Sequence, residues 1–109
     1  MANTYKVLGQ SNPSAATLTD CYTVPALTEA TVSTIMVANR SSVATSFRIS
    51  VAPAGAANSN EQYIYYDIVI AGNDSFAVTA GFTLEASDVI RVYATLATLS
   101  FNVFGVEIV

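Results

Sequence analysis

The stretch EQYIYYDIVI, residues 61–70, constrains the fold more than any other part of this sequence. Side chains of a strand alternate between its two faces, and a strand at the surface of a small domain usually pairs an apolar face with a polar one. The two faces of this segment carry Tyr63, Tyr65, Asp67 and Val69 on one side and Ile64, Tyr66, Ile68 and Ile70 on the other. We therefore expect the second face to contact another subunit. The alternative is a half-exposed aromatic face whose tyrosine hydroxyls reach water.

No helical layer is available to cover that second face, because the whole chain reads as β-strand. Short segments rich in Thr, Val, Ile, Tyr and Phe are separated by clusters of Pro, Gly, Asn, Asp and Ser, which is typical of an antiparallel β-sandwich. Periodicity does not specify strand order, so jelly-roll-like and immunoglobulin-like arrangements both remain open. We expect at most a helical turn besides eight or nine short strands. The expected strands are 4–9, 16–24, 29–39, 44–52, 61–71, 74–80, 88–95 and 98–108, with 82–85 as a short ninth.

Three strands show which side chains face the core. In residues 45–51 the apolar positions alternate with Ser46, Arg48 and Ser50, which we expect to face outward. In residues 88–95 and 98–108 the second face is mixed, because it includes Tyr93 and Phe104. The expected core positions are Phe47, Ile49, Val51, Leu99, Phe101 and Val103, and Ile90, Val92 and Ala94 share one face of the strand 88–95.

The composition also points to subunit contacts. Only 11% of the 109 residues are charged and 52% are hydrophobic, whereas a typical soluble domain is about 25% charged. Apolar surface in such excess is usually buried between molecules. We expect no contact with a membrane, since no apolar run approaches the roughly 20 residues of a spanning helix. The first ten residues do not resemble a signal peptide, so we expect synthesis in a host cytoplasm without export.

Several classes of function find no support in the sequence. The four cations, Lys6, Arg40, Arg48 and Arg91, are scattered, so we expect no nucleic-acid partner. Histidine is absent, which removes the commonest general base and metal ligand. We therefore expect no enzyme, no cofactor and no small-molecule substrate. Cys21 is the single cysteine, and it either fills the core or forms an intermolecular disulfide.

The acidic residues do not form a convincing site either. Glu85 with Asp88, and Glu61 with Asp67, are the carboxylate pairs that a glycosidase would need, but the first pair lies in an expected turn. Asn58, Asn60 and Glu61 cluster, as do Asn73 and Asp74, without the spacing or acid count of a calcium loop. We expect these side chains to make local turn hydrogen bonds.

The chain divides into an N-terminal arm and one domain. Residues 1–14 contain a short apolar patch followed by a polar break at Pro13, and we expect an extended arm that pairs its backbone edge with a neighbour. Residues 15–109 form the single sandwich domain. The longest irregular stretch is 52–62, APAGAANSNEQ, which we expect to form a flexible tip or a second arm.

Nearly the whole chain, from YKVLGQ to SFNVFGVEI, resembles a known class of proteins. The resemblance is carried by LTDCYTVPALTEATVSTIMVANRSSVATSFRISVAP, then YIYYD, then AGNDSFAVTAGFTLEASDVIRVYA. These segments are similar to small β-sandwich virion structural proteins of tailed bacteriophages, cyanophage-like ones in particular. The resemblance implies a non-enzymatic part of a virus particle and carries over no catalytic residue.

From the residues and the resemblance together we expect a capsid decoration or cement protein of the virion. Its partners are then copies of itself, with trimers natural, and other virion proteins such as the major capsid protein. The first alternative is a tail, baseplate or tail-fibre subunit, attached through Cys21. The second is a carbohydrate-binding module for host glycans, with exposed tyrosines stacking on sugars. The expected subunit interface consists of Tyr5, Val7, Tyr63, Tyr65, Val69, Tyr93 and Phe104.

Overall fold

The computed structural model describes residues 2–79 and 81–109, which form nine strands and two single turns of 3-10 helix. Met1 of the expected arm and Ala80 of the expected strand 74–80 lie outside the described residues. The expected all-β class is confirmed, and the short ninth strand is present as β7. The elements are β1 (Asn3–Ser11), β2 (Thr19–Thr23), β3 (Glu29–Asn39), β4 (Thr45–Ala52), η1 (Pro53–Gly55), η2 (Asn60–Gln62), β5 (Tyr63–Ile70), β6 (Ser75–Val78), β7 (Phe82–Leu84), β8 (Val89–Ala94) and β9 (Leu99–Ile108).

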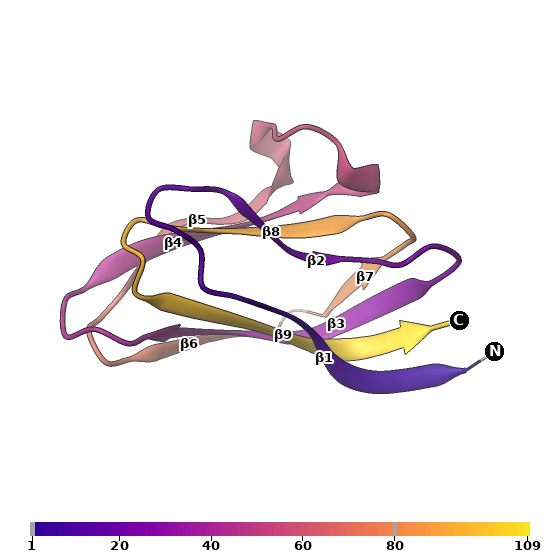
Figure 1. Ribbon diagram of the computed structural model, residues 1–109, viewed down its shortest axis with the longest axis horizontal. Coiled ribbons are helices and arrows are strands. Elements are labelled where there is room, and N and C mark those ends of the chain that lie inside the picture. Colours follow the sequence, from indigo (N-terminus) through magenta and orange to yellow (C-terminus); the bar gives the residue numbers. More distant parts are fainter. Residues whose placement is uncertain (1, 80) are drawn as a thin grey trace.

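The strands form two antiparallel sheets that pack face to face as a sandwich (Figure 1). One sheet has the order β1-β9-β3-β6, with β7 also paired to β3, and the other has the order β2-β8-β4-β5. Because β6 and β7 pair with different parts of β3, together they occupy one position. Most connections between consecutive strands cross from one sheet to the other. The resulting strand orders are those of a jelly roll. An immunoglobulin-like order is therefore wrong for this chain.

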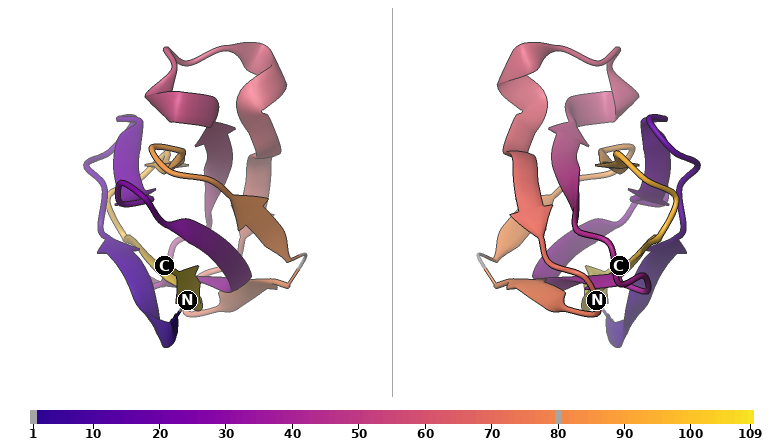
Figure 2. Two further views of the ribbon diagram at one scale, coloured as in Figure 1. Left: turned by 90° about the vertical axis from the view of Figure 1, so that its right-hand side faces the viewer. Right: turned by 90° about the vertical axis from the view of Figure 1, so that its left-hand side faces the viewer.

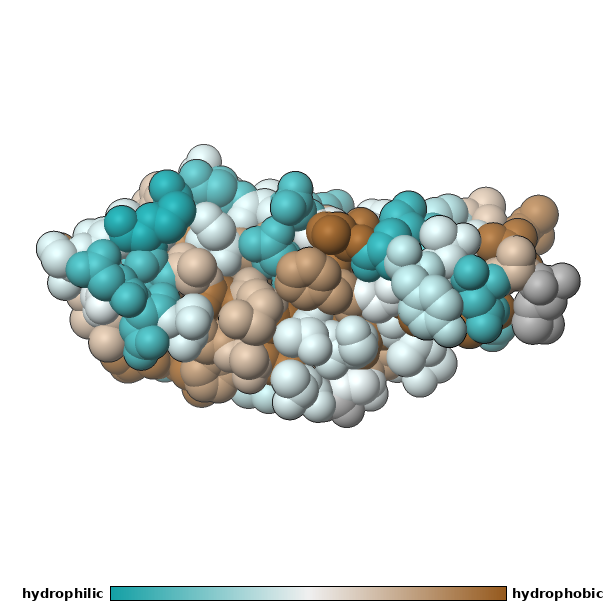
Figure 3. Space-filling view, turned by 90° about the horizontal axis from the view of Figure 1, so that it is seen from below, coloured by the Kyte–Doolittle hydropathy of each residue, from teal (hydrophilic) through white to brown (hydrophobic). Residues whose placement is uncertain are grey.

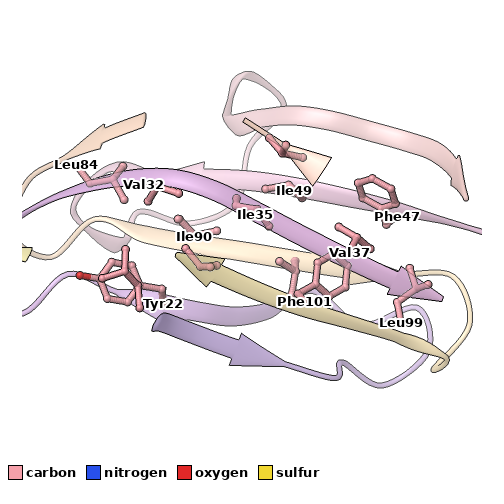
Figure 4. Close-up of a cluster of buried hydrophobic side chains, with 14 of the residues drawn as sticks. Tyr22, Val32, Ile35, Val37, Phe47, Ile49, Leu84, Ile90, Leu99 and Phe101 are labelled. Atoms are coloured by element: carbon pink, nitrogen blue, oxygen red, sulfur yellow. The ribbon is translucent and has the colours of Figure 1, made fainter. Parts of the chain in front are cut away.

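The core lies between the sheets and is built from the side chains that alternate inward (Figure 4). Two aromatic rings from opposite sheets, Phe47 and Phe101, meet edge to face with 6.1 Å between their centroids. The inward prediction is confirmed for five fully buried positions, while Val51 is only partly buried. The five are Phe47, Ile49, Leu99, Phe101 and Val103, and the three side chains that share a face of β8, Ile90, Val92 and Ala94, are also fully buried.

Ser50 departs from the predicted pattern. It was expected to face solvent, but it is fully buried. The loop between β4 and β5 folds over this end of the four-stranded sheet, at the top of Figure 1. Arg91, the cross-strand partner of Ser50, holds the loop there by donating to the Ala56 carbonyl at 2.9 Å. The stretch 52–62, expected as a flexible tip or an arm, is thus attached to its own sheet and includes η1 and η2.

β5 does not keep the single alternation that the sequence predicted. Ser50 of β4 pairs with Tyr63 while Ile49 pairs with Tyr65, so Ile64 is an extra residue in β5. Such a bulge changes which face the following side chains occupy. Tyr63 and Tyr65, predicted on one face, therefore lie on opposite faces.

A second bulge follows almost at once. Tyr66 and Asp67 together lie opposite Arg48, and Asp67 adopts a left-handed backbone with φ 53°. Aspartate is one of the few residues that tolerate this conformation. Three side chains of β5 pack against the core as a result: Tyr65, Ile68 and Ile70.

The N-terminal segment belongs to the sandwich. Residues 3–11 are extended, as expected for an arm, but they form β1 and pair with β9 of the same chain. A shift in register at Leu8 turns that side chain into the core. The structure therefore places residues 3–11 of the expected arm within the five-stranded sheet, along its margin (Figure 2).

Candidate functional site

The seven side chains expected at a subunit interface do not form one surface. Their positions follow from the strand pairing and from contacts with the core. Tyr5, Val7 and Phe104 lie on the outer face of the five-stranded sheet, Tyr63, Val69 and Tyr93 lie on the outer face of the four-stranded sheet, and Tyr65 packs inward. The structure thus offers two separate candidate surfaces.

The outer side of β1, β9 and β3, called here the five-stranded face, is the more apolar surface. Val7 lies directly opposite Phe104, and Tyr5 opposite Val106. Tyr5 is 79% exposed and Val7 45% exposed. β3 continues the face, with Thr34 opposite Phe104. Its apolar members are Tyr5, Val7, Met36, Phe104, Val106 and Ile108.

Figure 3 views the molecule from the side of this sheet. Hydrophobic and neutral residues occupy much of the middle of the view, while strongly hydrophilic residues form a dense group at the left end and smaller groups along the upper middle and toward the right. The β1–β9 pair also includes polar side chains, since Gln10 lies opposite Asn102 and donates to its side-chain oxygen at 2.7 Å. An apolar sheet face outside a complete core is typical of a contact surface.

The second surface is centred on Arg48 and is called here the Arg48 cluster: Arg48, Tyr66, Asp67 and Tyr93. The guanidinium carbon of Arg48 lies 4.2 Å from the ring centroid of Tyr66 and 4.3 Å from that of Tyr93. Its Nε donates to Asp67 Oδ1 at 2.7 Å. This hydrogen bond raises the pKa of Arg48, so the group remains a cation held between two aromatic rings.

Sequence reasoning named Tyr93 but missed the other three members of this cluster as site residues. Strict alternation along the strand places Tyr66 on the opposite face from Asp67. The bulge at these two residues brings both side chains to Arg48. The only sequence signal for it is an aspartate inside an apolar strand, since aspartate favours the left-handed backbone that a bulge of this kind uses.

Polar pairs surround the Arg48 cluster on the same sheet. Ser46 and Thr95 share a hydrogen bond of 2.7 Å between their hydroxyl oxygens. Arg91 Nε donates to Asp20 Oδ1 at 3.0 Å. Because polar groups on this sheet already hydrogen-bond to one another, it offers fewer free donors and acceptors than its composition suggests.

All four cations of the chain are engaged. Lys6 pairs with Glu107, Arg48 with Asp67 and Arg91 with Asp20, while Arg40 donates to the Ala97 carbonyl. They lie on different strands and loops and do not form a basic stripe of the kind that follows a nucleic-acid backbone.

Four of the acidic residues considered for catalysis or calcium make local hydrogen bonds or ion pairs, Asp88 and Asp74 with backbone amides, Glu61 with a serine hydroxyl and Asp67 with Arg48. Asp88 Oδ1 accepts the Ala54 amide at 2.8 Å, and its Oδ2 accepts the Glu85 amide at 3.0 Å. Asp74 accepts the Ser75 amide, and Glu61 accepts the Ser59 hydroxyl. Within residues 2–79 and 81–109, no group of three or more Cys, Asp or Glu side chains is placed to hold a metal ion. In the same residues, no helix has the length and apolar character needed to cross a bilayer.

Cys21 lies on β2 and packs against the core while remaining partly exposed. Burial raises the pKa of its thiol to about 11. The thiolate is the reactive form in disulfide exchange, so at neutral pH this cysteine reacts slowly. These properties favour core filling over an attachment disulfide.

No protein-family model matches this sequence, and comparisons with curated proteins and with solved structures give no match either.

Proposed function

We propose that the protein is a non-enzymatic structural protein of a bacteriophage particle, where it decorates and cements the capsid exterior as a homo-oligomer. The observation that carries the proposal is the five-stranded face, which is apolar although the core beneath it is complete. The resemblance of the sequence to small virion proteins supports the same conclusion. So does the jelly roll, a fold frequent in viral capsids and in lectins, although a fold alone does not fix function.

The proposed mechanism is burial of surface between subunits. A stable protein interface of standard size buries about 1,600 Å² in total and requires no chemistry. At roughly 25 cal/mol per Å² of apolar surface, a face with Phe104, Val106 and Met36 at its centre contributes substantially when covered. Repeated over many capsid positions, such contacts hold neighbouring capsomers together.

The first test is the number of copies per particle, measured by quantitative mass spectrometry against the major capsid protein. We expect hundreds of copies, comparable with the capsid protein. A few copies to a few dozen would instead place the protein in the tail, baseplate or tail fibre and would overturn the decoration proposal.

A matched pair of variants tests which face binds the particle. Met36→Glu places a charge on the five-stranded face, on β3 and away from β1. Val69→Glu places the same charge on the four-stranded sheet, at a side chain that is 72% exposed. After checking that both variants melt cooperatively, we expect Met36→Glu to lower occupancy on particles at least tenfold and Val69→Glu to leave it unchanged. The reverse result would assign binding to the outer face of the four-stranded sheet.

The carbohydrate-binding alternative receives less support. Stacking on sugars requires free aromatic faces, and on the four-stranded sheet Tyr66 and Tyr93 each already have the Arg48 guanidinium against their rings. A glycan array with signal that Tyr66→Ala abolishes would revive this alternative.

A further inference from the structure

The first part of β1 presents an unpaired backbone edge. Ala2 and Val109 exchange both of their backbone hydrogen bonds at 3.0 Å, so they form a hydrogen-bonded pair at the start of the β1–β9 ladder. Such pairs alternate with non-hydrogen-bonded pairs along an antiparallel ladder. The register is continuous from Asn3 to Val7. The amides and carbonyls of Asn3, Tyr5 and Val7 therefore point away from β9, toward the open side.

The open edge ends where β1 approaches the other sheet. A β-carbon on Gly9 would lie 2.2 Å from the Cys21 carbonyl oxygen, so from this point β1 lies against β2. All five residues from Asn3 to Val7 are exposed, and Figure 2 shows β1 at the margin of the molecule. The unpaired groups are thus accessible along a short, regular stretch.

The other sheet margins carry features that discourage pairing with another chain. β6 has four residues and β7 three, and very short edge strands pair poorly. β5 contains two bulges, and β2 has a register shift within five residues. By contrast, residues 3–7 are regular in register and include Tyr5 and Val7, which have high β-propensity.

We propose that residues 3–7 of β1 pair antiparallel with the same residues of a second copy, about a two-fold axis at Tyr5. Tyr5 then lies opposite Tyr5 of the other copy, and Asn3 opposite Val7. Each of these three pairs exchanges two hydrogen bonds, and the two five-stranded sheets become one continuous sheet. The proposal deepens the proposed function, because it names one contact of the oligomer and does not depend on where the particle carries the protein.

A second copy suits this edge on grounds of charge and symmetry. Each chain has a net charge of −4, so identical copies repel unless the contact is locally neutral. Lys6 is the charged residue of the stretch, and its Nζ lies 3.4 Å from Glu107 Oε1 of its own chain. A strand paired with itself about a two-fold axis is self-complementary by construction and closes at two subunits. Because five residues a side bury less than a standard interface, we expect a dissociation constant between about 10 µM and about 1 mM.

The experiment combines sedimentation equilibrium with residue-resolved amide hydrogen exchange by NMR, over protein concentrations from about 10 µM to about 1 mM. We expect a monomer–dimer equilibrium. As dimer forms, exchange at Asn3, Tyr5 and Val7 slows in proportion to the monomer that remains, by about twofold or more at about 1 mM, while Thr4 and Lys6, already bonded to β9, change little. A monomer throughout this range, a trimer, or a dimer without slower exchange at these three amides would each overturn the proposal.

Two variants at one position separate the backbone from the side chain. Tyr5→Pro removes the outward amide but no bond to β9, so we expect the fold to remain and the dimer to be lost. Tyr5→Thr keeps the amide and β-propensity, so the dimer remains with at most a tenfold weaker dissociation constant. Equal loss of the dimer in both variants would assign the contact to the tyrosine ring and overturn backbone pairing. Occupancy of the same two variants on particles is measured as well, so that a failure of β1 pairing can be distinguished from a failure of the decoration proposal.

Discussion

At the scale of single residues, burial makes Cys21 a source of pH-dependent stability. Its thiol pKa is raised from 9.0 to about 11 by desolvation, so the folded state holds the proton more tightly than the unfolded state. The contribution of this thiol to the free energy of unfolding is fully present below about pH 9 and is lost as pH rises through about 11.

We expect the free energy of unfolding to fall by roughly 2 kcal/mol across that window on account of this group. The measurement is urea unfolding at about pH 8 and about pH 10.5, with Cys21→Ala for comparison. The variant loses less stability between the two pH values than the wild type. Identical losses would mean that the thiol titrates normally in the folded protein.

Leu27 combines an unfavourable backbone conformation with an exposed side chain. It lies in the turn before β3 with φ 57° and is 91% exposed. A left-handed backbone costs a residue with a β-carbon about 1–2 kcal/mol, and an exposed leucine regains nothing from burial.

We therefore expect Leu27→Gly to stabilise the isolated protein by about 0.5–1 kcal/mol in thermal or urea unfolding. Ala26→Gly is the matched control, because its φ is not positive, and it destabilises by a similar amount. A destabilised Leu27→Gly would show that the leucine side chain makes a contact that its exposure conceals.

At the scale of elements, the Arg48 cluster ties β4 to both of its neighbours. Tyr66 and Asp67 come from β5 and Tyr93 from β8, and the bulge in β5 is what brings two side chains to one arginine. A cation between two rings contributes about 1 kcal/mol at a partly exposed site.

We expect Arg48→Met, which keeps the apolar stem but removes the charge, to lower the free energy of unfolding by about 1–2 kcal/mol. Arg40→Met serves as control, because Arg40 makes one exposed hydrogen bond, and changes stability by at most about 0.5 kcal/mol. If both variants behave alike in urea unfolding, the ring contacts of Arg48 contribute nothing.

At the scale of the whole molecule, one polar contact joins the two sheets through the core. Tyr22 of β2 donates to Glu107 Oε2 of β9 at 2.8 Å. Desolvation and this hydrogen bond raise the pKa of Tyr22 above its ordinary value, so the hydroxyl keeps its proton at neutral pH. Removing the Tyr22 hydroxyl leaves Glu107 Oε2 without this hydrogen-bond donor.

We expect Tyr22→Phe to destabilise the fold by about 1–2 kcal/mol, because a hydrogen bond to a charged partner is lost inside the protein. Tyr5→Phe serves as the control, because Tyr5 is 79% exposed, and it changes the free energy of unfolding by less than about 0.5 kcal/mol. Thermal unfolding followed by circular dichroism measures both, and a neutral Tyr22→Phe would show that water replaces the hydroxyl.

The sequence by itself determined the all-β class, the number of strands and most of the core. Period-two alternation is a local property of an extended chain. For that reason the sequence predicted the core positions Phe47, Ile49, Phe101 and Val103 correctly. The sequence also contains no histidine, and its four cations are scattered along the chain. Strand boundaries followed because Pro, Gly and Asn interrupt local hydrogen bonding wherever they occur.

Only the tertiary structure decided strand order, the bulges of β5 and the position of the N-terminal strand. Strand order depends on which distant segments pair, as β1 does with β9 at the other end of the chain. The bulge at Asp67 depends on a register shift against β4, and a shift of one residue moves every later side chain to the other face. For that reason the Arg48 cluster was missed, and the open edge of β1 became visible only once its other edge was paired.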